Sequence, residues 1–223
     1  MARFADRESA IRLRKQGMSY TQIKKIIGVS KSTLSCWLQK FPLSEEQIKE
    51  FQRQGWKKSE VSREKFRNTM RQKKEKRLRR IFTVQQKEIF PLTKRDIFLA
   101  GLFLYWGEGT KCRSDGLSIS NSDPSIIKFF ILWLSKSLKV PKKNLRVSLQ
   151  LYCDMEIDKE TKFWSETLGV SRSQFIRPYI KESSSERINH KGGFGHGTCN
   201  VRVNSVFLAE KIFMSVKVIS DSI

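Results

Sequence analysis

The sequence has 223 residues, with 44 Lys and Arg side chains against 22 Asp and Glu, and a formal net charge of +22. A hydrophobic fraction of 39% with 15 Phe excludes general disorder, and the length suffices for one or two folded domains. No apolar run approaches the roughly 20 residues that span a bilayer, and the N-terminus lacks the apolar segment of a secretory signal. The charge therefore predicts a nucleic acid as partner, no membrane, and a cytoplasmic location at the nucleoid.

Three short helices are predicted in the first 43 residues. The first covers residues 6–16, and a capping box at Ser19 and Gln22 begins the second. Gly28 makes a tight turn, and Ser30 caps a third helix over residues 31–40. Two helices around such a turn are typical of a helix-turn-helix, whose second helix enters the DNA major groove.

The stretch GVSKSTLSCW at residues 28–37 resembles a motif of resolvase- and transposase-type helix-turn-helix domains. Its outward positions are the candidate DNA contacts: Lys31, Ser32, Ser35 and Gln39. A three-helix module used only for packing is the alternative. The four cysteines, Cys36, Cys112, Cys153 and Cys199, form no C-x-x-C pair, so we expect reduced thiols and no zinc site.

Residues 44–90 are predicted to form a basic helical linker. Residues 53–80 alone carry 13 basic and 3 acidic side chains, and Ser44 with Gln47 makes a capping box. Apolar positions after Phe51 are too sparse for a continuous buried stripe, so we expect exposed helices or a solvated, partly disordered spacer. Its candidate phosphate contacts are Arg71, Lys73, Lys74 and Arg77.

The last part of the chain, residues 91–223, reads as an α+β domain. An apolar helix over residues 96–109 ends in Glu108, and strands are expected at 117–121, 145–152, 174–181 and 199–203. Further helices are expected at 125–138, 157–168 and 205–218. The aromatic residues in these helices are most simply core, and Asp115 and Asp123 are expected in a turn and an N-cap.

The segment FLAGLFLYWGEG at residues 98–109 resembles the dodecapeptide of LAGLIDADG homing endonucleases, over a domain spanning about residues 95–218. The resemblance implies an αββαββα domain, here with an inserted helix within residues 154–175. The small residue expected four positions before Gly107 is Phe103, and Gly101 lies two positions earlier.

The resemblance further implies a homodimer that cuts double-stranded DNA with Mg²⁺. Glu108 and Gly107 are the implied metal ligands, with Lys111 and Lys191 as candidate basic residues near the metal. The sheet is implied to lie in the major groove, and its candidate contacts are Ser118, Ser120, Arg146, Ser148, Gln150, Arg177 and Arg202.

Two functions therefore compete. The first is a site-specific DNA endonuclease, and the second is a non-cleaving transcriptional regulator built from the same two modules. A resolvase or transposase fits less well, because the catalytic domain that either requires has no place in this chain. Two alternatives concern single sites. Glu108 can be a solvated residue at a helix end, and His190 and His196 can form a metal site.

Overall fold

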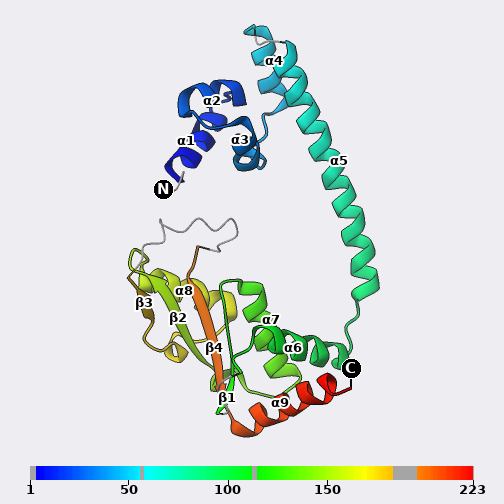
Figure 1. The fold of residues 1–223 in the computed structure, drawn as a ribbon, viewed down its shortest axis with the longest axis vertical. Coiled ribbons are helices and arrows are strands. Elements are labelled where there is room, and N and C mark those ends of the chain that lie inside the picture. The colour runs from blue at the N-terminus through cyan, green and yellow to red at the C-terminus, as the bar shows by residue number, and fades with distance from the viewer. Residues whose placement is uncertain (1–3, 56–57, 112–114, 183–194, 223) are drawn as a thin grey trace. The chain divides into compact units, whose positions relative to one another are not determined.

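The computed structural model of the chain describes residues 4–55, 58–111, 115–182 and 195–222. The chain divides into two compact units, Met1–Phe90 and Pro91–Ile223 (Figure 1). No described helix is both long and apolar enough to cross a membrane.

The first unit begins with the predicted helix-turn-helix. It consists of α1 (Phe4–Lys15), α2 (Tyr20–Ile27) and α3 (Lys31–Leu38), packed around Ala10, Ile23 and Leu34. The capping box at Ser19 is confirmed, since its hydroxyl accepts from Gln22 N while the Gln22 side chain accepts from Ser19 N. Gly28 ends α2 at a φ of 78°, in the left-handed conformation that the turn requires.

Two further helices pack on these three. Helix α4 (Glu45–Arg53) has the predicted Ser44–Gln47 capping box, and α5 (Lys58–Ile89) runs for 32 residues. Gly17 has a φ of 97°, and a Cβ placed there would lie 2.4 Å from the Phe51 ring, so the α1–α2 turn packs tightly on α4. Leu43, Ile48 and Val61 form a small core beneath α4 and α5.

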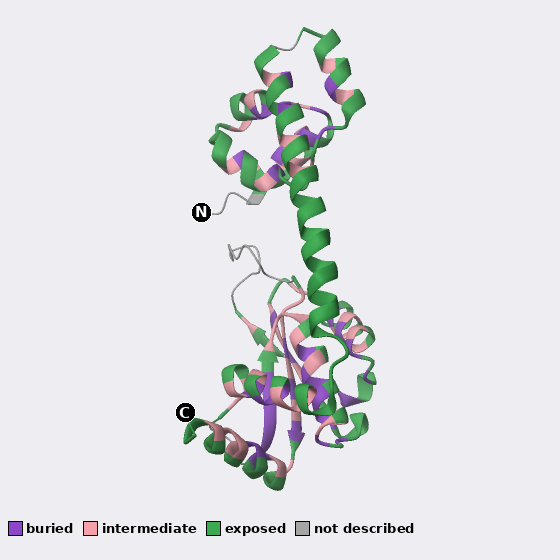
Figure 2. Ribbon diagram, turned by 90° about the vertical axis from the view of Figure 1, so that its right-hand side faces the viewer, coloured by how far each residue is buried: buried purple, intermediate pink, exposed green. Residues whose placement is uncertain are grey.

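The segment 44–71 therefore differs from the exposed linker that the sequence predicts. Arg14 of α1 is buried and pairs with the buried Glu64 of α5 at 2.8 Å, and Arg67 donates to Glu64 at 2.7 Å. The stripe that α5 buries is largely charged, which a search for apolar periodicity does not detect. From Gln72 to Ile89 every residue of α5 is exposed, so this part of the helix has the exposure predicted for the whole linker (Figure 2).

The second unit is a mixed four-stranded sheet with helices, and the α+β class is confirmed. Its helices are α6 (Lys94–Glu108), α7 (Pro124–Lys136), α8 (Ile157–Leu168) and α9 (Val206–Ser220). Its strands are β1 (Gly116–Asn121), β2 (Arg146–Tyr152), β3 (Tyr179–Lys181) and β4 (Thr198–Asn204), in the order β1-β4-β2-β3. Strand β4 is antiparallel to β1 and β2, while β3 is parallel to β2.

The order of elements is αβαβαββα, so α7 lies between the first two strands, which an αββαββα order would join directly. The strand expected at 174–181 is shorter than predicted. Residues Arg172–Gln174 form a 3-10 turn, in which the Gln174 side chain donates to the carbonyls of Lys142 and Leu145, and only Tyr179–Lys181 form a strand.

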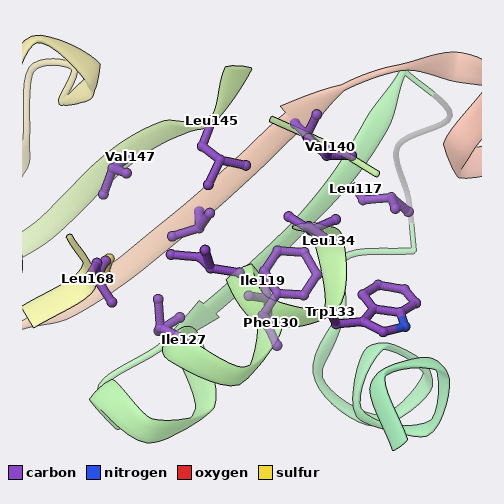
Figure 3. Close-up of a cluster of buried hydrophobic side chains, with 14 of the residues drawn as sticks. Leu117, Ile119, Ile127, Phe130, Trp133, Leu134, Val140, Leu145, Val147 and Leu168 are labelled. Atoms are coloured by element: carbon purple, nitrogen blue, oxygen red, sulfur yellow. The ribbon is translucent and has the colours of Figure 1, made fainter. Parts of the chain in front are cut away.

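The core of this unit lies between the sheet and its helices. Alternate strand residues such as Ile119 and Val147 belong to the same core as Phe130 and Trp133 of α7 (Figure 3). Gly101 of α6 allows the closest approach, because a Cβ there would lie 2.0 Å from the Trp133 ring. The Trp133 indole also donates to the Phe98 carbonyl of α6 at 3.1 Å. Gly101, the glycine of the dodecapeptide-like segment, therefore packs against a helix of its own chain.

Candidate nucleic-acid interface

The first candidate surface is the outer side of α3. Leu34 and Leu38 are buried and, with the partly buried Trp37, anchor the helix in the core, so the opposite side of the helix faces outward. All four predicted contacts are exposed: Lys31, Ser32, Ser35 and Gln39. Cys36 is also exposed beside them. This places two hydroxyls, an amide and an ammonium group on one accessible helix, which are donors and acceptors suited to base edges and phosphates.

A cluster of charged and aromatic side chains holds α5 against the helix-turn-helix. Arg14 donates to the carbonyls of Met18 and Phe41 as well as to Glu64, so its guanidinium is fully engaged. The guanidinium groups of Arg14 and Arg67 lie 4.7 and 4.2 Å from the centre of the Tyr20 ring. Burial raises the pKa of the Tyr20 hydroxyl, and the two arginines oppose that rise. Sequence reasoning missed this cluster, because nothing local links residues 14 and 64.

The predicted phosphate contacts on α5 fall in two environments. Lys73, Lys74 and Arg77 are exposed on the free half of the helix. Arg71 is half-buried at the end of the packed half, where it donates to Asn68 at 2.9 Å. Three of the four are therefore accessible to a polyanion.

The second unit offers a polar sheet face on the side opposite the core. We use that name for the outward residues of three strands: Ser118, Ser120, Arg146, Ser148, Gln150, Tyr152, Thr198, Asn200 and Arg202. The pairing of β1, β4 and β2 places Ser120, Asn200 and Ser148 in one row across the sheet. The Asn200 amide donates to Ser120 at 2.7 Å, so the row is hydrogen-bonded.

The sequence had singled out most of this face. Five of the predicted contacts are accessible on it: Ser120 and Arg146 are exposed, and Ser148, Gln150 and Arg202 are partly buried. Ser118 is buried. Arg177 is exposed but lies outside the strands, between the 3-10 turn and β3. Asn200 and Thr198 were missed, although the alternation in residues 199–203 was the signal for them.

One pair on this face is electrostatically unfavourable. Arg146 of β2 stands opposite Arg202 of β4 in the register. Like charges directly across two strands destabilise a sheet. The charge of Arg202 is balanced by Asp115, to which Arg202 donates a hydrogen bond. Arg146 has no carboxylate within ion-pair distance in the described part of the chain. An anion bound to this face would relieve the repulsion.

The predicted catalytic residue, Glu108, lies at the end of α6. A capping box between Thr93 and Asp96 begins this helix. At its C-terminal end, the Gly109 amide donates a hydrogen bond to the Tyr105 carbonyl. The carboxylate of Glu108 is exposed and has no hydrogen-bond or ion-pair partner among the described residues. Gly107 is also exposed, and a Cβ there would meet nothing within 4 Å. Helix α6 thus presents Glu108 at an open surface.

The described residues contain no group of three or more His, Cys, Asp or Glu side chains placed to hold a metal ion. One chain contributes a carboxylate at Glu108 and a carbonyl at Gly107, which are hard oxygen donors of the kind Mg²⁺ takes but too few to complete a site. Lys111 is exposed near the end of the helix. Lys191 and His190 lie outside the described residues. His196 pairs with the buried Glu160 at 2.7 Å and stacks on Phe163.

Comparison with known proteins supports the assignment of the N-terminal domain that carries α3. Residues 1–43 match the family model of a homeodomain-like domain. No curated protein and no solved structure matches the chain. The N-terminal domain is therefore a homeodomain-like helix-turn-helix, which indicates DNA binding, and nothing in these comparisons supports the LAGLIDADG resemblance.

Proposed function

We propose that this protein binds double-stranded DNA at a specific sequence and reads that sequence with α3. The observation that carries the proposal is the exposure of all four predicted contacts of α3 on a homeodomain-like helix-turn-helix. The Gln39 amide offers a donor and an acceptor together, which suits the N6 and N7 positions of adenine. Lys31, at the start of the helix, suits a guanine edge or a phosphate.

The free half of α5 would then follow the DNA backbone. A duplex carries a phosphate charge about every 1.7 Å along its axis, and each phosphate neutralised adds about 0.9 to the slope of log K against log salt. Lys73, Lys74 and Arg77 are exposed on this half, and no ion pair engages them in the described part of the chain. We expect them to raise affinity without selecting sequence.

The polar sheet face is proposed as a second DNA-reading surface. Gln150 and Asn200 carry amides, Arg146 carries a free guanidinium, and all three are on the same side of the sheet. A two-stranded β-ribbon fits the major groove as an α-helix does. The protein would therefore recognise a site longer than a single helix-turn-helix covers.

Selection of bound sequences from a random duplex pool, followed by footprinting, tests the proposal. We expect enrichment of one sequence, with protection extending beyond the base pairs that one recognition helix contacts. Substitution of Gln150 and Asn200 by Ala should shorten the protected region, while the double variant of the exposed helix residues Lys128 and Lys159 should leave it unchanged. If no sequence is enriched from the pool, the proposal of sequence-specific DNA binding is contradicted.

A second candidate is DNA cleavage that requires Mg²⁺, with Glu108 of two copies at one site. It is favoured by the open position of Glu108 and by an exposed α6 face that includes Ala100, Phe103 and Gly107, on which a second copy has room to pack. Mg²⁺ bound there would supply activation of water and stabilisation of a leaving oxygen. In one chain, Glu108 and the Gly107 carbonyl would contribute its oxygen ligands.

The selected duplex separates this candidate from the non-cleaving regulator. With Mg²⁺, cleavage that Glu108→Gln abolishes and Glu156→Gln preserves, with binding intact in both, would support the nuclease. Glu156, the N-cap residue of α8, is also an exposed carboxylate. Tight binding of the selected duplex without any cleavage would assign the protein to regulation instead.

A further inference from the structure

A hollow of about 550 Å³ opens on the second unit, where the loop after α7, the start of β2 and the start of α9 meet. We call it the cationic hollow. Its lining includes Lys139, Lys143 and Arg146, with Asn144, Asn204 and Ser205 as polar neighbours, and none of the residues that line it is acidic. The polar sheet face already includes Arg146, but neither the fold nor the proposed reading surfaces account for Lys139 and Lys143 beside it.

These cations are free to bind a ligand. Lys139, Lys143 and Arg146 are all exposed, and no described carboxylate lies within ion-pair distance of any of them. The neighbouring Lys142 differs, since its ammonium group donates to the Leu168 carbonyl at the end of α8. Lys142 therefore has a structural role in this loop, whereas Lys139 and Lys143 have no ion-pair partner among the described residues.

The backbone at Lys139 supports a functional role for its side chain. Its φ is 59°, the one positive value among the described residues other than glycine. The residue lies two positions beyond Ser137, the C-cap of α7, where the next amide, Val140 N, donates to Leu134 O at 2.9 Å. Glycine is the residue that adopts this left-handed conformation most readily. A lysine here costs conformational energy that glycine would not. The fold therefore places a cation at a position whose backbone conformation favours glycine.

The cationic hollow also adjoins the polar sheet face. Arg146 belongs to both, since it lines the hollow and stands opposite Arg202 in the sheet. A duplex lying on the sheet would bring its phosphates toward this end of β2. We propose that the cationic hollow binds the phosphodiester backbone of DNA, with Lys139 and Lys143 as its phosphate contacts. This rests on the proposed DNA binding of the sheet face.

The salt dependence of binding tests the inference in the full-length protein. Lys139→Gln with Lys143→Gln should reduce the slope of log K against log salt by about 1.8, for two phosphates. The loss of affinity should be equal on the selected and on a scrambled duplex, because phosphates carry no sequence information. Lys128→Gln with Lys159→Gln removes the same charge from the exposed sides of α7 and α8 and should leave the slope unchanged.

The outcomes are separable. If the wild type binds no duplex, the proposed function fails and this inference fails with it. If the wild type binds and both double variants keep its slope, only the cationic hollow is overturned. If a free nucleoside triphosphate binds the wild type but not the Lys139/Lys143 variant, while the DNA slope stays the same, the hollow takes a small phosphate ligand and the inference is likewise overturned.

A single substitution separates ligand binding from a structural role. Lys139→Gly should match or exceed the wild type in melting temperature, because glycine accepts the left-handed conformation, yet it should weaken DNA binding and reduce the slope by about 0.9. A lower melting temperature with unchanged DNA affinity would show that Lys139 serves only the fold.

Discussion

The two halves of α5 have the same basic character but opposite environments. Residues 58–71 bury Val61 against Leu43 and Ile48 and bury Glu64 against Arg14, whereas every residue from Gln72 to Ile89 is exposed. The packed half is distinguished by Val61 in the small core and by one buried carboxylate, Glu64, which pairs with two arginines. A helix side that alternates charge with a few apolar residues becomes buried when a partner of opposite sign faces it. Four predictions test this contrast, from the largest effect to the smallest.

Glu64→Gln should destabilise the first unit by about 3–5 kcal/mol, because it leaves Arg14 buried without its charge partner. Amide hydrogen exchange measured on peptides of α1–α3 reports this loss. Glu75→Gln, on the free half of the same helix, should change stability by less than about 0.5 kcal/mol. Equal effects of the two substitutions would mean that Glu64 does not hold α5 in place.

Val61→Ala should cost about 1.5–3 kcal/mol, since Val61 is 5% exposed and its methyl groups complete the core beneath α4. Leu78→Ala removes a larger side chain, but Leu78 is 50% exposed on the free half, so we expect a change within about 0.5 kcal/mol. Urea denaturation of the two variants measures the difference. A larger loss for Leu78→Ala would show that the free half is packed.

Arginines on the two halves should differ in what they do. Arg67→Gln should lower stability by about 1 kcal/mol, because Arg67 is partly exposed and donates to Glu64. Arg77→Gln should leave stability unchanged and reduce the salt slope of DNA binding by about 0.9. Thermal melts and binding titrations at several salt concentrations check both. The contrast fails if Arg77→Gln destabilises the fold and leaves the slope intact.

The smallest effect concerns the Tyr20 hydroxyl. Its pKa is raised above 10.0, chiefly by burial, so its neutral form favours the fold. The stabilisation is complete below the unfolded pKa and is lost as pH rises through the folded pKa. The free energy of unfolding should therefore fall more steeply above pH 10 in the wild type than in Tyr20→Phe. Parallel curves for the two proteins at alkaline pH would refute this.

The sequence predicted the elements that depend on local chemistry. Capping boxes at Ser19 and Ser44, the turn at Gly28 and the alternation in β2 and β4 are each encoded within a few residues, and all are confirmed. Arg14 and Glu64 are 50 residues apart, so their pairing requires the tertiary fold. The strand expected at 174–181 was shortened for a similar reason, because Gln174 bonds to carbonyls of residues 142 and 145.

The candidate site divides in the same way. The exposed contacts of α3 follow from helical periodicity around Leu34 and Leu38. The three cations of the cationic hollow lie close together within residues 139–146, but residues 203–208 complete its lining, so its shape requires the tertiary fold. Gly101 carries a further lesson, since the glycine of an apparent motif packs against Trp133 of its own chain. A motif therefore identifies a helix more securely than it identifies the partner of that helix.

The central claim is that α3 reads DNA sequence. The most direct measurement is the ratio of dissociation constants for a scrambled and the selected duplex, in the wild type and in Ser35→Ala/Gln39→Ala. Each base contact contributes about 1–3 kcal/mol of discrimination, so we expect the ratio to fall at least tenfold while binding to the scrambled duplex is unchanged. An unchanged ratio with normal folding would contradict the claim.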